Sequence, residues 1–129
     1  MGADTWMHAP SIATMADSRL RLHLGDTKVG EFYQMGERNS GANKFVSQSL
    51  DFKDRSDVDR VSPASGDIVD TIIDTYHSVV FETAPFDRST DISGLFSGRL
   101  EFVTNKKDFD FQIQLYEHTA DGKYFELSW

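Results

Sequence analysis

Two stretches of the chain alternate apolar and polar residues with a period of two. Residues 19–24 read Arg-Leu-Arg-Leu-His-Leu, and residues 109–115 read Phe-Asp-Phe-Gln-Ile-Gln-Leu. Side chains point to opposite faces along a strand, so this period is typical of strands with one buried face. We therefore predict strands at both places, and the second pattern is the clearest in the chain.

Weaker patterns of the same kind predict further strands between turn signals. Gly25-Asp26 is expected to end the first strand, and Ala120-Asp121-Gly122 forms a hairpin turn with Gly at the positive-φ position. Ser11 after Pro10 predicts the cap of a short helical turn. Residues 67–76 fit a helix by their apolar spacing or a strand by their β-branched residues. The further strands are expected within residues 29–35, 45–50, 78–83, 91–103 and 124–128.

The order of these elements sets the expected fold class. Short strands separated by Gly and Asp turns, without a long helix, favour an antiparallel β-sandwich. We predict an all-β jelly roll of the galactose-binding-domain kind, and residues 1–129 fit a single domain. The chain stops at Trp129, one strand after a hairpin, which leaves a sheet edge bare. It is therefore expected to be the front portion of such a domain, and either to pair edge to edge as a homodimer or to be poorly stable.

Charge and composition exclude several classes of partner and chemistry. Lys and Arg total 13 against 21 Asp and Glu, which gives a formal net charge of −8. Because such a chain repels phosphate groups, neither nucleic acid nor a membrane surface is an expected partner. The absence of cysteine excludes disulfides and thiolate sites, and no apolar run is long enough to span a bilayer. No signal peptide is recognisable, and the sequence does not assign a compartment.

An ordered set of short motifs runs from the first tryptophan to the last turn. They are Trp6–Ser11, Phe81–Pro85, Thr90–Gly94, Leu100–Val103, Lys107–Phe111, Leu115–Glu117 and Asp121–Lys123. In this order they resemble the C-terminal jelly-roll domain of the cocaine esterase, X-prolyl dipeptidyl peptidase and α-amino-acid ester hydrolase family. The residues between about 36 and 76 match that family poorly.

This resemblance implies a non-catalytic accessory domain of a larger serine hydrolase. In the family, the domain follows an α/β-hydrolase catalytic domain and continues past the position of Trp129. The parent is therefore expected to be an acyl esterase or an X-Pro dipeptidyl-peptidase type of enzyme, with the missing catalytic domain as the partner of this chain. One face of the sandwich is expected to pack on that domain and shape its substrate cleft, with Leu95 and Phe96 as candidate contacts.

No catalytic, metal-binding or cofactor-binding residue is assigned from the sequence. The nucleophile elbow Gly-x-Ser-x-Gly is missing, because residues 94–98 place Ser97 one position off. Glu82, Asp108 and Asp110 are candidates for the paired carboxylates of a glycoside hydrolase, but the resemblance makes them turn and strand-face residues. The histidines lack the spacing of metal ligands and are expected at the surface or at strand ends; they are His8, His23, His77 and His118.

Two binding functions remain as alternatives. One is calcium binding by an acidic loop, although interleaved arginines favour a solvated loop. The other is a carbohydrate-binding module, in which exposed aromatic rings would stack on sugars, although most of these rings are expected in the core. The loop residues are Asp51, Asp54, Arg55, Asp57, Asp59 and Arg60, and the aromatic residues are Trp6, Phe32, Tyr33, Tyr116, Tyr124 and Trp129.

Overall fold

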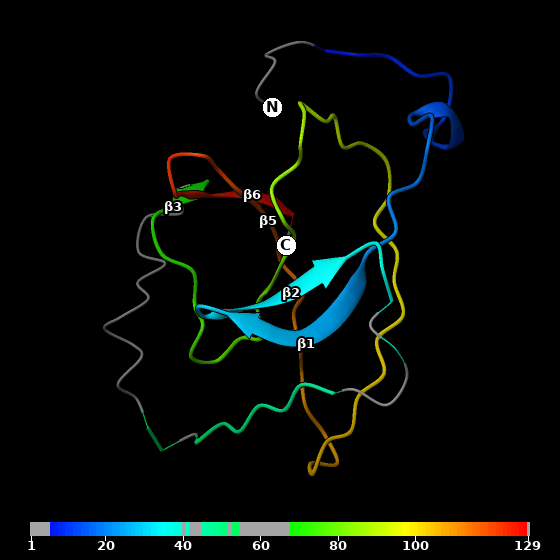
Figure 1. Ribbon diagram of the computed structural model, residues 1–129. Coiled ribbons are helices and arrows are strands. Elements are labelled where there is room, and N and C mark those ends of the chain that lie inside the picture. Colours follow the sequence, from blue (N-terminus) through cyan, green and yellow to red (C-terminus); the bar gives the residue numbers. More distant parts are fainter. Residues whose placement is uncertain (1–5, 40, 42–44, 52, 55–67, 129) are drawn as a thin grey trace.

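Short strands dominate the regular structure of the chain. The computed structural model describes residues 6–39, 41, 45–51, 53–54 and 68–128. These residues contain six strands and one turn of 3-10 helix, which confirms the predicted all-β class. Figure 1 shows how the elements are arranged. The elements are η1 (Ile12–Thr14), β1 (His23–Val29), β2 (Phe32–Gly36), β3 (Val69–Asp70), β4 (Phe81–Glu82), β5 (Leu115–His118) and β6 (Tyr124–Ser128).

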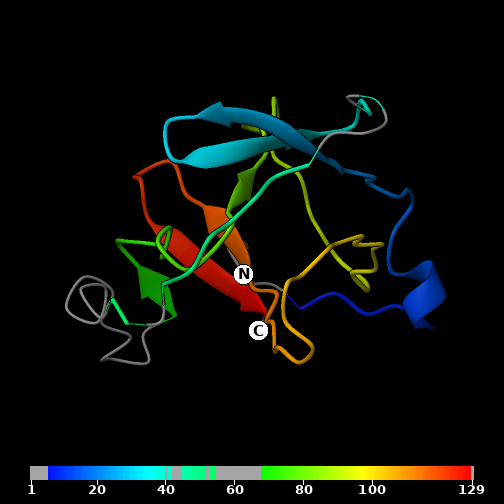
Figure 2. The same cartoon turned by 90° about the horizontal axis from the view of Figure 1, so that it is seen from below.

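The strands form two three-stranded sheets. One has the order β1-β2-β4 and the other has the order β3-β6-β5. Figure 2 shows the blue and cyan β1–β2 hairpin on one side of the molecule and the red β6 on the other. This arrangement confirms the predicted sandwich. The pairing of β2 with β4, in which Tyr33 lies opposite Phe81, is parallel, and the other three pairings are antiparallel.

The β1–β2 hairpin begins later in the chain than the alternating pattern predicts. A two-residue turn joins Val29 to Phe32, and Gly30 within it adopts a φ of 61° that suits glycine. Gly25 and Asp26, which were expected to end a strand, lie inside β1, whereas residues 19–22 lie in no strand. The prediction of a strand over residues 19–24 is therefore wrong for its first four positions. A ladder needs a hydrogen-bonding neighbour, and the neighbour β2 meets residues 23–29 instead.

The β5–β6 hairpin agrees with its sequence prediction. Gly122 has a φ of 79°, and the Thr119 amide donates a hydrogen bond to the Lys123 carbonyl at 2.8 Å. The ammonium of Lys123 lies 2.8 Å from a carboxylate oxygen of Asp121. This hydrogen bond lowers the pKa of Asp121 and raises the pKa of Lys123. Both groups are exposed, so the pair closes the turn without adding much stability.

Three other segments that were predicted as strands form no hydrogen-bonded ladder, so those predictions are wrong. Residues 45–50, 91–103 and 109–114 form no ladder, and only Phe81–Glu82 of the segment 78–83 does so. The alternation sets which side chains share a face, but a strand is assigned by its backbone hydrogen bonds. Within the described residues, the main chain of these three segments has no backbone partner.

The segment 67–76, whose pattern fitted a helix or a strand, contains β3 and no helix among its described residues. The helical turn after Pro10 is confirmed as η1. Its start at Ser11 is tied to Thr14, because the Thr14 amide donates to the Ser11 carbonyl at 3.1 Å and the Ser11 amide donates to the Thr14 hydroxyl at 3.2 Å. No helix in the described part of the chain is long and apolar enough to cross a membrane.

The space between the two sheets is only half closed. No described residue is fully buried, and the accessible surface is 12113 Å². A compact monomer of 14.6 kDa has about 6,900 Å² by the usual scaling of surface with mass. Among the described residues, many large apolar side chains are therefore exposed, including Leu95, Phe45 and Val103.

Candidate functional site

Four side chains from both sheets meet where the sheets approach each other, and we call them the inter-sheet cluster. Phe32 on β2 and Glu82 on β4 come from one sheet, and His118 on β5 and Tyr124 on β6 come from the other. The His118 ring stacks on Tyr124 with centroids 4.7 Å apart, and Phe32 meets Tyr124 edge to face at 6.2 Å. These contacts link the two sheets through side chains rather than through the backbone.

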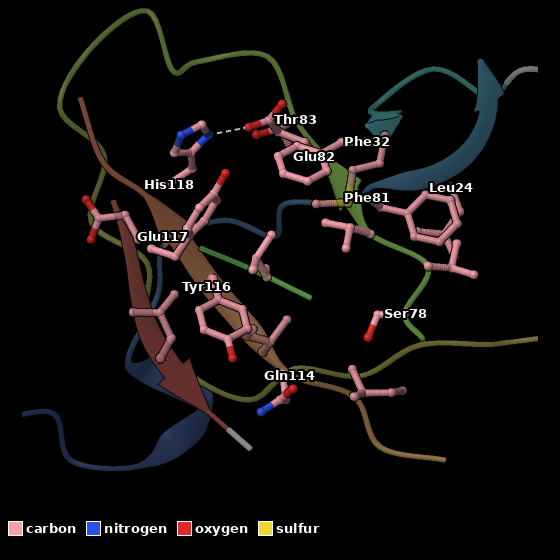
Figure 3. Close-up of a pocket in the computed structure, with 18 of the residues that line it drawn as sticks. Leu24, Phe32, Ser78, Phe81, Glu82, Thr83, Gln114, Tyr116, Glu117 and His118 are labelled. Atoms are coloured by element: carbon pink, nitrogen blue, oxygen red, sulfur yellow. Dashed lines mark hydrogen bonds and ion pairs between the residues drawn. The ribbon is translucent and has the colours of Figure 1, made fainter. Parts of the chain in front are cut away.

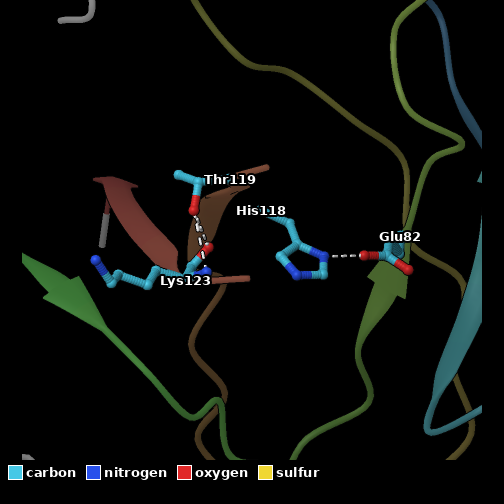
Figure 4. Close-up of polar contacts among 4 residues, drawn as sticks. All are labelled: Glu82, His118, Thr119 and Lys123. Atoms are coloured by element: carbon cyan, nitrogen blue, oxygen red, sulfur yellow. Dashed lines mark hydrogen bonds and ion pairs between the residues drawn. The ribbon is translucent and has the colours of Figure 1, made fainter. Parts of the chain in front are cut away.

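A contact between a histidine and a carboxylate completes the inter-sheet cluster. Nδ1 of His118 contacts a carboxylate oxygen of Glu82, as the dashed line in Figure 4 shows. Both side chains are partly exposed, so the pair is worth at most about 1 kcal/mol. Burial raises the pKa of Tyr124, and the nearby charges of Glu82 and Glu31 raise it further. Its phenol therefore stays protonated well above neutral pH.

Tyr116 on β5 has a similar environment. Burial is the main cause that raises its pKa, and the carboxylates of Glu126 and Asp70 add to the effect. Both phenols are thus partly buried near acidic groups, Tyr116 beside carboxylates of its own sheet and Tyr124 beside Glu82 and Glu31, which belong to the strands and turn of the other sheet. Each is more easily kept neutral in the folded chain than in the unfolded one.

A wide pocket opens beside the inter-sheet cluster. Figure 3 shows His118 and Glu82 at its rim, with Tyr116 and Gln114 on one side and Phe81 and Leu24 on the other. Both sheets contribute to the lining, so the pocket is the unfilled space of the half-closed sandwich. Its walls are more apolar than polar, which suits a packed partner better than a small polar ligand.

The His118–Glu82 pair has the form of a base with an orienting acid, but the remaining part of a triad is not assembled. No hydroxyl of a described residue forms a hydrogen bond with the His118 ring. Ser97, the nearest match to an elbow serine, lies in an exposed segment without regular structure. In the part of the chain that the structure describes, no three or more His, Asp or Glu side chains form a group that could hold a metal ion.

The carboxylates suggested for glycoside hydrolysis have different environments. Glu82 lies in β4 and pairs with His118, whereas Asp108 and Asp110 lie in the exposed segment before β5. Of the remaining histidines, His8 is exposed, His23 lies in β1, and His77 lies edge to face against Tyr76 with centroids 4.8 Å apart. The four histidines thus lie in different parts of the chain.

Only part of the acidic loop lies within the described residues. Asp51 accepts a hydrogen bond from the Lys53 amide at 3.0 Å, and Asp54 accepts one from the Tyr76 hydroxyl. These two carboxylates bind neighbouring protein groups. The other four residues of the predicted loop, Arg55, Asp57, Asp59 and Arg60, lie outside the described residues, so calcium binding there stays a prediction.

The aromatic residues suggested for sugar stacking are divided between the sheets. Phe32 and Tyr124 pack on each other across the two sheets. The ring centroids of Tyr33 and Phe81 are 5.8 Å apart, and the Lys28 ammonium lies 5.5 Å from the centroid of the Tyr33 ring. Trp6 is exposed in the N-terminal segment. Trp129 lies outside the described residues. Sugar binding therefore stays a prediction without a shared aromatic platform among these described rings.

A comparison with protein families identifies the chain. The model of the X-Pro dipeptidyl-peptidase C-terminal non-catalytic domain matches residues 5–128. The chain belongs to this family. None of the curated proteins and none of the solved structures matches the chain. The family assignment confirms the resemblance that the ordered motifs had indicated.

The inter-sheet cluster ties the two sheets together through side chains. Sequence analysis did not identify this cluster as a unit. Glu82 was considered for hydrolysis, His118 for metal binding, and Phe32 and Tyr124 for sugar stacking. The sequence could indicate only that Phe32 and Tyr124 each point toward the inner face of a strand. It could not indicate the contact of Glu82 with His118, because 36 positions separate these two residues.

Proposed function

We propose that this chain is an accessory β-sandwich domain of a serine hydrolase, an acyl esterase or an X-Pro dipeptidyl-peptidase type of enzyme. It packs on the catalytic α/β-hydrolase domain of its parent and helps to shape the substrate cleft. The family supports the accessory role, since its description names a non-catalytic domain of X-Pro dipeptidyl-peptidases. A non-catalytic domain acts through the domain with which it is joined.

The observation that carries the packing proposal is the exposed apolar segment between residues 92 and 103. Leu95 is 79% exposed and Phe96 is 61% exposed, with Ile92, Leu100 and Val103 also open to solvent. Monomeric soluble proteins rarely keep large contiguous apolar patches uncovered. A second, catalytic domain would cover these side chains. Each side chain that becomes fully buried would contribute about 2 kcal/mol to the free energy of association between the two domains.

The first test is the gene sequence upstream of Trp6. A coding region with a Gly-x-Ser-x-Gly elbow supports the proposal, and a parent without an α/β-hydrolase region overturns it. In the intact hydrolase, Leu95→Lys and Phe96→Lys should lower the thermal midpoint and kcat/KM. Cleavage of a Gly-Pro anilide and of a simple acyl ester then separates the two enzyme types.

A matched control is available in Val29→Lys. Val29 is 62% exposed, which is about the exposed fraction of Phe96. It lies at the tip of the β1–β2 hairpin, far from the yellow segment that contains residues 95 and 96 (Figures 1 and 2). This variant should leave both quantities unchanged. Equal losses in the control and in the two test variants would show that any exposed lysine harms the enzyme, and would contradict the packing face.

A further inference from the structure

The pocket between the two sheets is too large for a small ligand. Its volume is about 3840 Å³, whereas pockets for small molecules measure about 300–1,000 Å³. Apolar and aromatic side chains from both sheets line it, as Figure 3 shows for Leu24, Phe81 and Tyr116. A polypeptide segment with apolar side chains therefore fits both the size of the pocket and its walls.

The charges that line this pocket determine which kind of segment it can accept. Carboxylates from β3, β4, β5 and the connecting segments line it, whereas no Lys or Arg of the described residues does so. Arg88 and Lys107 are close in sequence to two of these carboxylates but lie outside the lining. The apolar walls are thus combined with negative charge, which matches a partner of positive charge. The carboxylates include Asp70, Glu82, Asp91, Asp110 and Glu117.

Two of these carboxylates have no cation of the same chain beside them. Asp91 and Asp110 form no ion pair or hydrogen bond with any described residue, whereas Glu82 contacts His118. A metal ion does not suit them, because no three His, Asp or Glu side chains in the described part of the chain form a group that could hold one. Lys and Arg side chains spaced along a segment match carboxylates that are spread around a pocket.

We propose that the catalytic domain of the parent inserts a basic amphipathic segment into this pocket. Its apolar side chains lie against the two sheets, and its Lys or Arg side chains lie beside Asp91 and Asp110. The proposal rests on the accessory function proposed above and adds the chemistry of the contact. The pocket is continuous with the proposed packing face, because Phe96, Leu100 and Val103 belong to both. One domain can therefore cover that face and fill the pocket.

The test compares two matched pairs of charge reversals in the intact hydrolase. The pocket pair is Asp91→Lys with Asp110→Lys, and the control pair is Asp87→Lys with Asp108→Lys. All four aspartates are exposed and lie outside the helices and strands, but the two control residues do not line the pocket. Both pairs change the net charge by the same amount, so any general effect of charge is the same for the two.

The pocket pair should lower the thermal midpoint of the intact hydrolase by about 3 °C or more beyond the control pair, because its lysines would oppose the basic segment. High salt should reduce this difference. In the isolated 129-residue chain, which lacks the catalytic domain, the two pairs should have the same unfolding midpoint. A difference of equal size in the isolated chain would assign these carboxylates to the stability of the chain itself, and would overturn the proposal.

A labelled synthetic peptide of Leu and Lys at helical spacing gives a second measurement, by fluorescence anisotropy with the 129-residue chain. The pocket pair should bind this peptide about tenfold more weakly than the control pair does. A peptide with Glu in place of every Lys should not bind. Equal affinities of the two pairs for the basic peptide, or equally tight binding of the acidic peptide, would overturn the proposal.

Failure of this proposal can be distinguished from failure of the accessory function. If Leu95→Lys and Phe96→Lys lower the midpoint of the intact hydrolase but the pocket pair behaves like the control pair, the catalytic domain packs without a basic segment in the pocket. That result overturns only the present proposal. A parent without an α/β-hydrolase region overturns both, and the peptide measurement then shows whether the pocket accepts a basic segment of another protein.

Discussion

Phe32 offers the most direct test of the contact between the two sheets, through the substitution Phe32→Ala. The Phe32 ring is half-buried and meets Tyr124 edge to face at 6.2 Å and His118 edge to face at 6.5 Å. Truncation of a fully buried Phe costs about 3–5 kcal/mol, so a half-buried one should cost roughly 2 kcal/mol. The two lost ring contacts add about 0.5 kcal/mol or more. We expect a total loss of about 2–3 kcal/mol in the free energy of unfolding.

The assay is urea unfolding at a fixed protein concentration, followed by fluorescence and circular dichroism. With a typical m value, a loss of this size lowers the midpoint by about 1 M or more. The matched control is Phe45→Ala, the same substitution at a ring that is 84% exposed, which should cost less than about 0.5 kcal/mol. Equal midpoints for the two variants would refute the inter-sheet role of Phe32.

A double-mutant cycle isolates the ring contact itself. Phe32→Ala and Tyr124→Ala should together cost less than the sum of the single changes, with a coupling energy of about 0.5–1.5 kcal/mol. Strict additivity would mean that the two rings do not stabilise the sandwich through each other, even if each is important alone.

Two further predictions concern the backbone and the phenols. Gly25→Ala should destabilise the chain by about 1–3 kcal/mol in the same urea assay, because the added Cβ would lie 2.6 Å from the Gln34 carbonyl oxygen. The control is Gly36→Ala, which should cost less because a Cβ there would have no atom within 4 Å. Equal losses of stability for the two variants would contradict the close contact at Gly25. The pKa values of Tyr116 and Tyr124 are higher in the folded chain than in the unfolded one. The two neutral phenols therefore contribute stability that is fully present below the unfolded pKa of about 10, and that should be lost as the pH rises through their folded pKa values. Denaturation curves between pH 9 and 12 check this, and Tyr124→Phe should reduce the loss; an unchanged slope would contradict the role of Tyr124.

The local sequence determined the elements whose partners lie close along the chain. The Asp-Gly signal at 121–122 predicted the β5–β6 hairpin, because a short turn fixes both the direction and the neighbour of the returning strand. Ser11 predicted η1 for the same reason, since its bonding partner Thr14 is three residues away. The ordered motifs between Trp6 and Lys123 were also sufficient to indicate the family to which the chain belongs.

The tertiary structure decided which predicted strands acquire partners and which side chains meet. Residues 109–114 have the clearest strand pattern in the chain but form no ladder within the described residues, while Phe81–Glu82 does so by parallel pairing with β2. Alternation encodes which face a side chain occupies, and it does not encode the strand that lies beside it. The contact of Glu82 with His118 joins different sheets and distant positions in sequence, and such a contact forms only after the chain has folded the two sheets together.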